Sequence, residues 1–422
     1  MMYTDFIAAI DLGTSQITGM VGKKNVDGAL SILACETESS AGCIRRGCIH
    51  NVKEAANRVK RLIEKLERRL PGSRIEKVYV GVGGQSVRSI EHAVSHTPEA
   101  GDVVTDEMID RLYEACKACK PDMLDVLDIV SPAYYLDGKL EAHPVGVPCK
   151  KIEARYKLIV GRPSLRQYMI KSIQEHAGIK IAGIVVSPLA LADVVLSESE
   201  KEQGCALIGF GAGVTSLAVY REGVLVGLYV IPLGGNLITK DLKKLNVTEE
   251  EAERIKQTYG SAAADKEKEN EINLIIEARS REILENVCFR LEETGIVNTL
   301  GAGIVITGGA SALNNLKNMI GERLGKPVRY AAIRKGIVEK TDTAADSACL
   351  VATGLLYQGT QNCAAYIPPP PKPEPVPDVK PTPPPAPTPP PMQAPPKKGF
   401  FHKVKTKVEV GMGELFKDDE DQ

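Results

Sequence analysis

Apolar residues in the first part of the chain follow two periods, one typical of strands and one typical of helices. From residue 5 the pattern predicts a β-hairpin and further strands. A helix follows, with apolar positions that recur every three or four residues: Val52, Ala55, Ala56, Val59, Leu62, Ile63 and Leu66. Residues 78–82 are continuously apolar, as in a short buried strand. The sequence therefore predicts mixed α/β structure.

The same periods continue along the rest of the chain. They predict strands at 156–160 and 303–307 and helices near 105–119, 165–177, 249–259, 273–294, 311–324 and 344–357. Thr248 and Glu251 would form a capping box at the start of the helix at 249–259.

A glycine-rich turn occurs twice, about 200 residues apart, each time within an apolar β-hairpin. The first copy reads Ile-Asp-Leu-Gly-Thr-Ser at residues 10–15, and the second reads Ile-Gly-Phe-Gly-Ala-Gly-Val-Thr-Ser at 208–216. Glycine lets backbone N–H groups approach a phosphate closely, and a Thr or Ser hydroxyl adds a donor. Two such hairpins that face each other could hold the phosphates of one nucleotide.

The paired turns resemble the two phosphate loops of the actin superfamily. Residues 303–311 are similar to that superfamily's adenosine loop, and residues 234–260 resemble part of the FtsA family of bacterial cell-division proteins. A proline-rich linker and a short amphipathic tail end the chain, as in that family. The resemblance covers roughly residues 5–360 and the tail. It implies an actin-like (ribonuclease H-like), two-lobed α/β fold.

The resemblance also implies how the chain is divided. A small inserted α/β subdomain used in self-association and partner contacts would interrupt the first lobe, although an insertion without a role is the alternative. A helical insert would interrupt the second lobe. The implied segments are 1–84 and 163–195 for the first lobe, 85–162 for its insert, 196–235 and 301–343 for the second lobe, 236–300 for its insert, 344–366 for a C-terminal helix, 367–396 for the linker and 397–422 for the tail.

The resembling segments supply candidate residues for binding ATP and Mg²⁺. Asp11 would hold a water molecule of the Mg²⁺ ion, unless it serves only the turn. Glu253 and Lys256, three apart on a helical face, match ribose and adenine contacts, or else form an ordinary surface ion pair. The candidate phosphate donors are Gly13, Thr14, Ser15, Gly211, Ala212, Gly213, Val214 and Thr215. The residues expected under the purine base are Gly308, Gly309 and Ala310.

The second turn departs from the family pattern. The family's two acidic positions in this loop are occupied here by Gly209 and Ser216, and Ser187 stands where a Glu is usual. Groups that would order Mg²⁺ and the attacking water are therefore missing, while the glycines that surround the phosphates remain. Because phosphoryl transfer in such sites depends on positioning and charge neutralisation, we expect ATP binding with slow or absent hydrolysis. The alternative is that Asp11 and another residue suffice for catalysis.

Composition narrows the possible functions. The 422 residues are 43% apolar and 25% charged with a net charge of −1, which argues against a general nucleic-acid binder. Ten cysteines without a secretory signal suggest reduced thiols in a cytosol. Cys116 and Cys119 lie in a predicted helix without a second pair at zinc spacing, so we interpret them as structural. No run of 18 apolar residues is present.

The end of the chain has a different composition. Residues 367–396 include 17 prolines, which is typical of a semi-rigid polyproline spacer. The following tail is basic, and its pattern predicts an amphipathic helix on an anionic membrane, with a disordered charged end as the alternative. The residues on its apolar side are Phe400, Phe401, Val404, Val408, Leu415 and Phe416.

Together with the resemblance to the FtsA family, these features imply an actin-like scaffold that binds ATP, polymerises and links the FtsZ ring to the cytoplasmic face of the membrane at the division site. As the resemblance implies, the C-terminal peptide of tubulin-like FtsZ would bind the second-lobe insert, where Arg279, Arg281 and Arg290 could meet an acidic peptide or be solvated. Other divisome proteins would be further partners. The alternatives are an ATPase or kinase of the same fold and a pilus-assembly relative.

Overall fold

The computed structural model describes residues 5–99, 102–261, 271–339 and 349–365. All of these described residues belong to one compact unit. The predicted linker at 367–396 and the predicted amphipathic tail at 397–422 lie outside the described residues. Among the described helices, none combines the length and apolar character needed to span a membrane.

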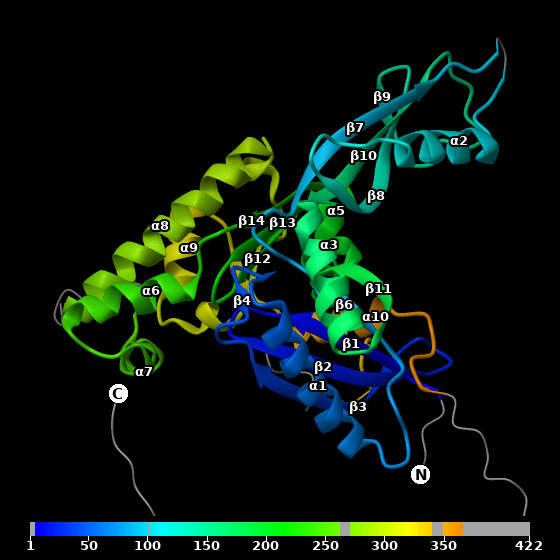
Figure 1. Ribbon diagram of the computed structural model, residues 1–422. Coiled ribbons are helices and arrows are strands. Elements are labelled where there is room, and N and C mark those ends of the chain that lie inside the picture. The colour runs from blue at the N-terminus through cyan, green and yellow to red at the C-terminus, as the bar shows by residue number, and fades with distance from the viewer. Residues whose placement is uncertain (1–4, 100–101, 262–270, 340–348, 366–422) are drawn as a thin grey trace, which may run out of the picture. The chain divides into compact units, whose positions relative to one another are not determined.

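A five-stranded sheet carries the first glycine turn (Figure 1). The order is β11-β6-β1-β2-β3, with β1 antiparallel to β2 and parallel to β6. Residues on opposite faces of β2 contact different helices: a Cβ at Gly19 would meet Leu66 of α1, and a Cβ at Gly22 would meet Leu356 of α10. The bounds are β1 Ile7–Leu12, β2 Gln16–Lys24, β3 Leu30–Ser39, β6 Lys77–Val82, β11 Lys180–Val186, α1 Val52–Arg69 and α10 Leu350–Gln358.

A nine-stranded sheet carries the second turn, in the order β16-β15-β12-β13-β14-β7-β10-β8-β9. Alternate residues of β12 face different cores: Ile208 packs in a cluster with α8, and Leu207 packs in the larger cluster that includes α4. Helices α4 and α8 therefore cover opposite faces. The bounds are β12 Cys205–Phe210, β13 Thr215–Arg221, β14 Val224–Ile231, β15 Gly303–Thr307, β16 Val328–Tyr330, α4 Ser187–Val195 and α8 Glu271–Glu293.

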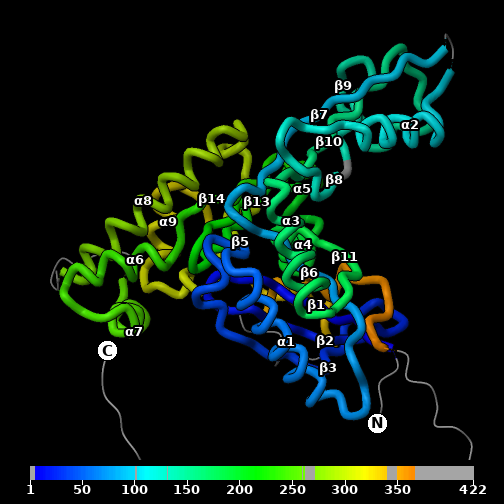
Figure 2. Tube along the Cα trace, in the orientation of Figure 1, coloured from blue at the N-terminus to red at the C-terminus, as the bar shows by residue number. Residues whose placement is uncertain are grey.

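The far end of this sheet is built by residues of the predicted insert at 85–162, traced in Figure 2. Its strands have their own hydrophobic core, which includes Tyr156 and Leu112. Strand β7 joins β14 through one residue pair, Arg88 with Tyr229. The bounds are β7 Arg88–His96, α2 Asp106–Lys117, β8 Asp125–Leu136, β9 Lys139–Glu141 and β10 Ile152–Gly161.

Shorter elements connect these layers. The predicted helix at 165–177 is present, although its second half is π-helical. The helix at 249–259 begins where expected, with Thr248 accepting the backbone N–H of Glu251. The remaining bounds are β4 Ile44–Arg45, β5 Cys48–Ile49, α3 Pro163–Met169, η1 Ile170–His176, α5 Glu198–Gln203, α6 Gly235–Leu242, η2 Lys243–Leu245, α7 Glu249–Tyr259, η3 Val297–Thr299, η4 Gly309–Ala312 and α9 Leu316–Leu324.

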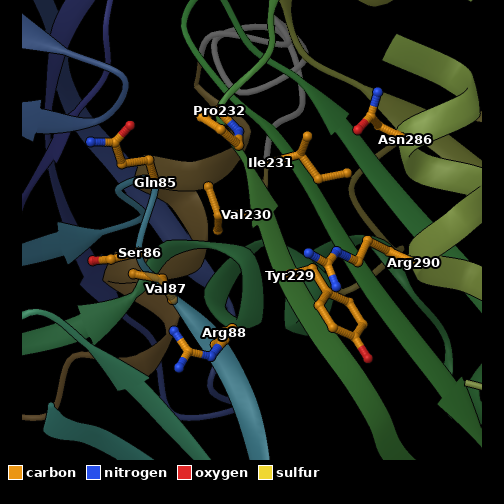
Figure 3. A pocket seen from close by; sticks show the side chains of 10 residues that line it. All are labelled: Gln85, Ser86, Val87, Arg88, Tyr229, Val230, Ile231, Pro232, Asn286 and Arg290. Carbon is orange, nitrogen blue, oxygen red and sulfur yellow. The ribbon is translucent and has the colours of Figure 1, made fainter. Parts of the chain in front are cut away.

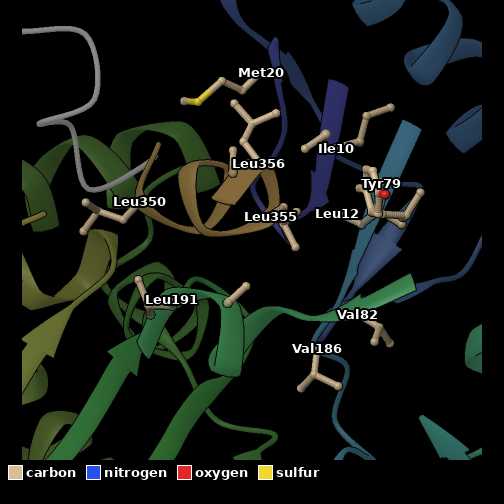
Figure 4. Packing of buried hydrophobic residues seen from close by; sticks show 14 of the residues in the cluster. Ile10, Leu12, Met20, Tyr79, Val82, Val186, Leu191, Leu350, Leu355 and Leu356 are labelled. Atoms are coloured by element: carbon tan, nitrogen blue, oxygen red, sulfur yellow. The ribbon is translucent and has the colours of Figure 1, made fainter. Parts of the chain in front are cut away.

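Helices α4 and α10 cross in the larger core, where Leu191 and Leu350 pack and where Leu355 lies beside Leu12 at the end of β1 (Figure 4). The crossing is so close that a Cβ at Gly354 would lie 2.1 Å from the carbonyl oxygen of Ala190. Only glycine fits there, because this contact is with backbone and cannot be relieved by a side-chain rotation. The core thereby fixes Ser187, the first residue of α4, beside the end of β1.

Candidate nucleotide site

The two glycine turns meet in the structure. A Cβ at Gly213 would lie 2.6 Å from Oγ1 of Thr14, so the tip of the second turn lies against the side chain of the first. Each turn is also closed tightly on itself. A Cβ at Gly13 would lie 2.5 Å from the carbonyl oxygen of Gln16, and one at Gly211 would lie 2.8 Å from that of Val214. Glycine is therefore required for the same steric reason in both copies.

The hydroxyl groups of the two turns have different surroundings. Thr14 accepts the backbone N–H of Gly47 at 2.9 Å, which leaves its own proton to donate, and Ser15 is exposed. Thr215, in contrast, is buried and donates its hydroxyl to the carbonyl of Leu233 at 2.8 Å. The role of the Thr215 hydroxyl in this structure is therefore to hold the turn, and a phosphate contact from it stays a prediction.

Asp11 lies at the end of β1, and its carboxylate accepts a hydrogen bond from Ser187 at 3.2 Å. Burial raises the pKa of Asp11 to about 6, although the hydrogen bond from Ser187 opposes the shift. Gly81 leaves room for both groups, since a Cβ there would lie 2.5 Å from Oγ of Ser187. A carboxylate enclosed in this way, with one hydroxyl donor, suits a hydrated divalent cation, whose charge would favour the ionised form.

Gly209 and Ser216, which occupy the two positions where the sequence analysis expects acidic residues, face each other in the second turn. Gly209 is directly opposite Ser216 in the β12–β13 register, and a Cβ at Gly209 would lie 2.6 Å from Oγ of Ser216. Ser187, the third position where the sequence predicts a missing carboxylate, lies within hydrogen-bonding distance of Asp11. The described part of the chain contains no group of three or more His, Cys, Asp or Glu side chains arranged to hold a metal ion.

Glu253 and Lys256 form part of a buried network. Lys256 is 8% exposed and donates to Glu253 at 2.6 Å, to Thr239 at 2.9 Å and to the carbonyl of Gly235 at 3.3 Å. Burial alone would raise the pKa of Glu253, but hydrogen bonds from Lys256, Thr239 and Gln257 outweigh it and hold the pKa below its usual value. The lysine is therefore enclosed, whereas the side chain of Glu253 is 37% exposed, and contact of the two residues with ribose and base stays a prediction.

The network connects to the other predicted segments through the start of α6. Gly235 donates its N–H to the carbonyl of Gly211 at 3.0 Å, and Asn236 donates to that of Ala212 at 2.8 Å. A Cβ at Gly235 would lie 3.2 Å from Cβ of Ala310 and 3.5 Å from Nζ of Lys256. The second turn, the predicted adenosine loop and the Glu253–Lys256 helix therefore converge at one glycine, which is missing from the set of residues predicted from the sequence.

The adjacent glycines of the predicted adenosine loop have different roles. Gly308 has φ 91°, and a Cβ there would lie 2.3 Å from the carbonyl oxygen of Phe210, so it supports the end of β12. A Cβ at Gly309 would meet no described atom within 4 Å. Gly308 is thus a structural requirement, whereas Gly309 borders open space where a flat base could lie.

The three arginines predicted to meet a partner are already ion-paired. Arg279 bonds Asp241 at 2.6 Å, Arg281 bonds Glu277 at 2.7 Å and Arg290 bonds Glu293 at 2.7 Å. Arg290 alone of the three lines a cavity of about 390 Å³, together with Arg88, Asn286 and Tyr229 (Figure 3). Its guanidinium also lies 5.6 Å from the ring centre of Tyr229. The three arginines therefore differ in what a partner could reach.

The sequence is similar to those of known cell-division proteins. The family model for the cell division protein FtsA matches residues 206–354. The chain is 36% identical over 383 residues to cell division protein FtsA of Porphyromonas gingivalis, covering 85% of this chain and 79% of that protein. It is 31% identical over 356 residues to FtsA of Bacillus subtilis, covering 79% of this chain and 80% of that protein.

Among solved structures, the PilM–PilN type IV pilus biogenesis complex contains a chain that superposes with a TM-score of 0.59 at 17% identity. That match covers 83% of this chain and 97% of the pilus protein. At such low identity it shows the α/β, actin-like fold alone, because one fold serves many functions. The identities to the division proteins are higher and extend over most of both sequences. The chain therefore belongs to the FtsA family of cell-division proteins, within the actin-like ATPase superfamily.

Proposed function

We propose that this protein is an ATP-binding scaffold that polymerises and attaches the FtsZ ring to the cytoplasmic membrane at the division site. The proposal of ATP binding rests on one observation: the two glycine turns, Gly309 and the Lys256 network lie close together. The turns would donate to phosphates, Glu253 and Lys256 would contact ribose and base, and Asp11 would hold Mg²⁺ through water. The bound Mg²⁺ would neutralise phosphate charge.

Gly309 provides the test of the nucleotide site. A valine there meets no described atom at its Cβ position, so Gly309→Val should keep the melting temperature and fill the space proposed for the base. Calorimetry should show ATP binding in the micromolar range for the wild type and a loss of 100-fold or more for the variant, which corresponds to about 3 kcal/mol. Unchanged affinity in a folded Gly309→Val protein would remove the adenosine-loop assignment.

We propose that hydrolysis is slow, because one enclosed carboxylate, Asp11, remains where the family pattern has several. Ser187 and Ser216 can donate hydrogen bonds but cannot take a proton from water or balance a metal charge as carboxylates do. The protein would therefore use ATP mainly to set a conformation that favours polymer contacts. A turnover of about 1 s⁻¹ or faster, in the range of efficient phosphoryl-transfer enzymes, would contradict this proposal.

Membrane attachment and self-association rest on the sequence and on the family. One amphipathic tail binds weakly, so a polymer that presents many tails would bind much more tightly through avidity. The inserted subdomain at 85–162 is the proposed self-association element. Phe401→Asp should release the protein from anionic liposomes in flotation while ATP binding is kept, and Asp418→Asn is the matched control. Equal flotation of Phe401→Asp and wild type would exclude the tail as anchor.

We propose that the acidic C-terminal peptide of FtsZ contacts the second-lobe insert at Arg290. Arg290 borders a cavity with a second cation, Arg88, whereas Arg279 is only 24% exposed and paired to Asp241. Fluorescence anisotropy with a labelled FtsZ peptide should show at least fivefold weaker binding for Arg290→Ala. Arg281→Ala is the matched control, since it removes an equally charged residue from the same helix. Equal losses for both variants would indicate a general charge effect.

A further inference from the structure

We infer that Cys35 and Cys349 form an oxidisable thiol pair that closes into a disulfide and fastens the start of helix α10 to strand β3. Their Sγ atoms are 3.1 Å apart, although 314 positions separate them in the sequence. A disulfide has an S–S distance of about 2.05 Å, so the two sulfur atoms need to approach by only about 1 Å. Nothing in the proposed nucleotide site uses either thiol.

The packing of α10 against the sheet brings the two thiols together. Cys35 is directly opposite Met20 in the β2–β3 register. Met20 in turn accepts the hydroxyl of Thr353 on α10 at 3.6 Å, and that hydroxyl also donates to the carbonyl of Cys349 at 2.9 Å. This side of β2 and β3 therefore faces the first turn of α10. The pair therefore lies where strand β3 packs against the start of helix α10.

The two cysteines differ in access to solvent. Cys35 is partly exposed, and Cys349 is 6% exposed. A small peroxide would therefore reach Cys35 first. The Cys35 thiolate attacks one peroxide oxygen and becomes a sulfenic acid, with release of water after protonation. The Cys349 thiol then attacks Sγ of Cys35, the S–S bond forms and the sulfenic hydroxyl leaves as a second water. In sum, two thiols and one hydrogen peroxide give one disulfide and two waters.

Other cysteines of the chain provide an internal comparison. Burial raises the pKa of Cys205 to about 12 and that of Cys116 to about 11, so these thiols stay protonated near neutral pH. Cys116 is followed by Cys119, three positions later, on or next to the same helix. This second pair has the sequence spacing of a redox motif and, like the first pair, has one buried and one partly exposed thiol. We expect Cys35 and Cys349 to react faster because their Sγ atoms already lie 3.1 Å apart.

The disulfide would constrain helix α10, which packs closely against α4. Helix α10 crosses α4 at Gly354 with almost no free space, and α4 begins at Ser187 beside Asp11. Joining the start of α10 to β3 would restrict movement at this crossing and would also constrain the unfolded chain, because the closed loop is long. The oxidised protein should therefore unfold at a higher temperature than the reduced protein, by about 4 °C for a chain of this size.

Peptide mapping tests the pair directly. The full-length protein is reduced, desalted, treated with hydrogen peroxide, alkylated in denaturant and digested without reductant before mass spectrometry. A peptide that links Cys35 to Cys349 should appear in most wild-type molecules and be absent from Cys35→Ser and Cys349→Ser. Both Cys116 and Cys119 should be recovered in the alkylated form. Recovery of Cys35 as a sulfinic acid, with Cys349 still alkylated, would overturn the inference.

Thermal unfolding tests the fastening separately. Peroxide should raise the melting temperature of the wild type, and dithiothreitol should reverse the change. Cys35→Ala and Cys35→Ser should both fold and show no rise. Should the cross-linked peptide be present while the melting temperature stays unchanged, the disulfide would not fasten α10 to β3, and that part of the inference would be wrong.

Discussion

The two glycine turns have similar backbone geometry but differ in their side chains. In each, a turn glycine is required because a Cβ would strike a carbonyl oxygen three residues later, that of Gln16 in one and Val214 in the other. Two residues before the turn glycine, however, the first copy has Asp11 and the second has Gly209. The steric requirement for a turn glycine is thus the same on both sides, and a carboxylate is present on one side alone. If the turns bind phosphate as proposed, mutations can separate binding from hydrolysis.

The turns also differ in how they are supported. The second turn is fixed by α6, whose first two N–H groups, from Gly235 and Asn236, bond the carbonyls of Gly211 and Ala212. Its threonine hydroxyl is used internally. The first turn keeps an exposed serine, and Thr14 accepts a hydrogen bond from Gly47. In the proposed site, the second turn would therefore provide rigid backbone donors, and the first would provide side-chain donors and the charge for the metal.

The strongest test of the comparison breaks the contact between the turns. In Gly213→Val the new side chain would occupy the position of the Thr14 side chain, because even its Cβ would lie 2.6 Å from Thr14 Oγ1. ATP affinity should fall by 100-fold or more, equivalent to about 3 kcal/mol. Calorimetry checks the affinity, and circular dichroism checks that the protein remains folded. Wild-type affinity in the variant would show that the two turns do not enclose one ligand.

The charge on the first turn can be tested by pH. In the folded protein the pKa of Asp11 is raised to about 6 from 3.8, so the folded state binds more protons than the unfolded chain between these values. Without nucleotide, stability should therefore fall as pH rises from about 4 to 6, by about 3 kcal/mol. Asp11→Asn removes this loss and should be more stable than wild type at pH 8, with no gain at pH 3.5.

Denaturant unfolding at the two pH values measures the effect of Asp11→Asn on stability. The same variant should bind Mg²⁺–ATP more weakly, which calorimetry measures at pH 8. Ser187→Ala is the control, since it removes the hydrogen bond to Asp11 and leaves the carboxyl in place. A variant that gains no stability at pH 8 would mean that the carboxyl is not penalised by burial.

A further test adds a carboxylate to the second turn and measures whether ATP turnover rises. Gly209→Asp alone would place its Cβ 2.6 Å from the Ser216 hydroxyl, so we expect it to need a partner change. The double variant Gly209→Asp, Ser216→Gly should raise ATP turnover by about tenfold, equal to about 1.4 kcal/mol in the barrier. Single-turnover assays on both variants measure this. If Gly209→Asp alone hydrolyses ATP faster than the double variant does, the Ser216 side chain moves away without a second substitution, and our expectation of a partner change is wrong.

Much of this fold follows from local pattern, whereas the network behind the second turn does not. The helix Val52–Arg69 has the apolar residues predicted for it on its buried side, and the hairpins that carry both turns form at the predicted positions. The sequence predicts Glu253 and Lys256 on one helix, and both lie on α7. Their hydrogen-bond partners Thr239 and Gly235, however, come from a separate helix, α6. Thr239 and Gly235 were missed for this reason, although the Gly-Gly pair at 234–235 was a visible signal.

The smallest expected effect concerns that network. Thr239 donates to Glu253 at 2.6 Å and accepts from Lys256 at 2.9 Å, so it positions both proposed nucleotide contacts. Thr239→Val keeps the shape and removes the hydroxyl, which should weaken ATP binding about fivefold, or about 1 kcal/mol. Thr239→Ser, the matched control, should bind as wild type does. If the network positions Glu253 toward ribose, the loss for Thr239→Val should be smaller with 2′-deoxy-ATP; an equal loss with both nucleotides would place the effect on the base or on folding instead.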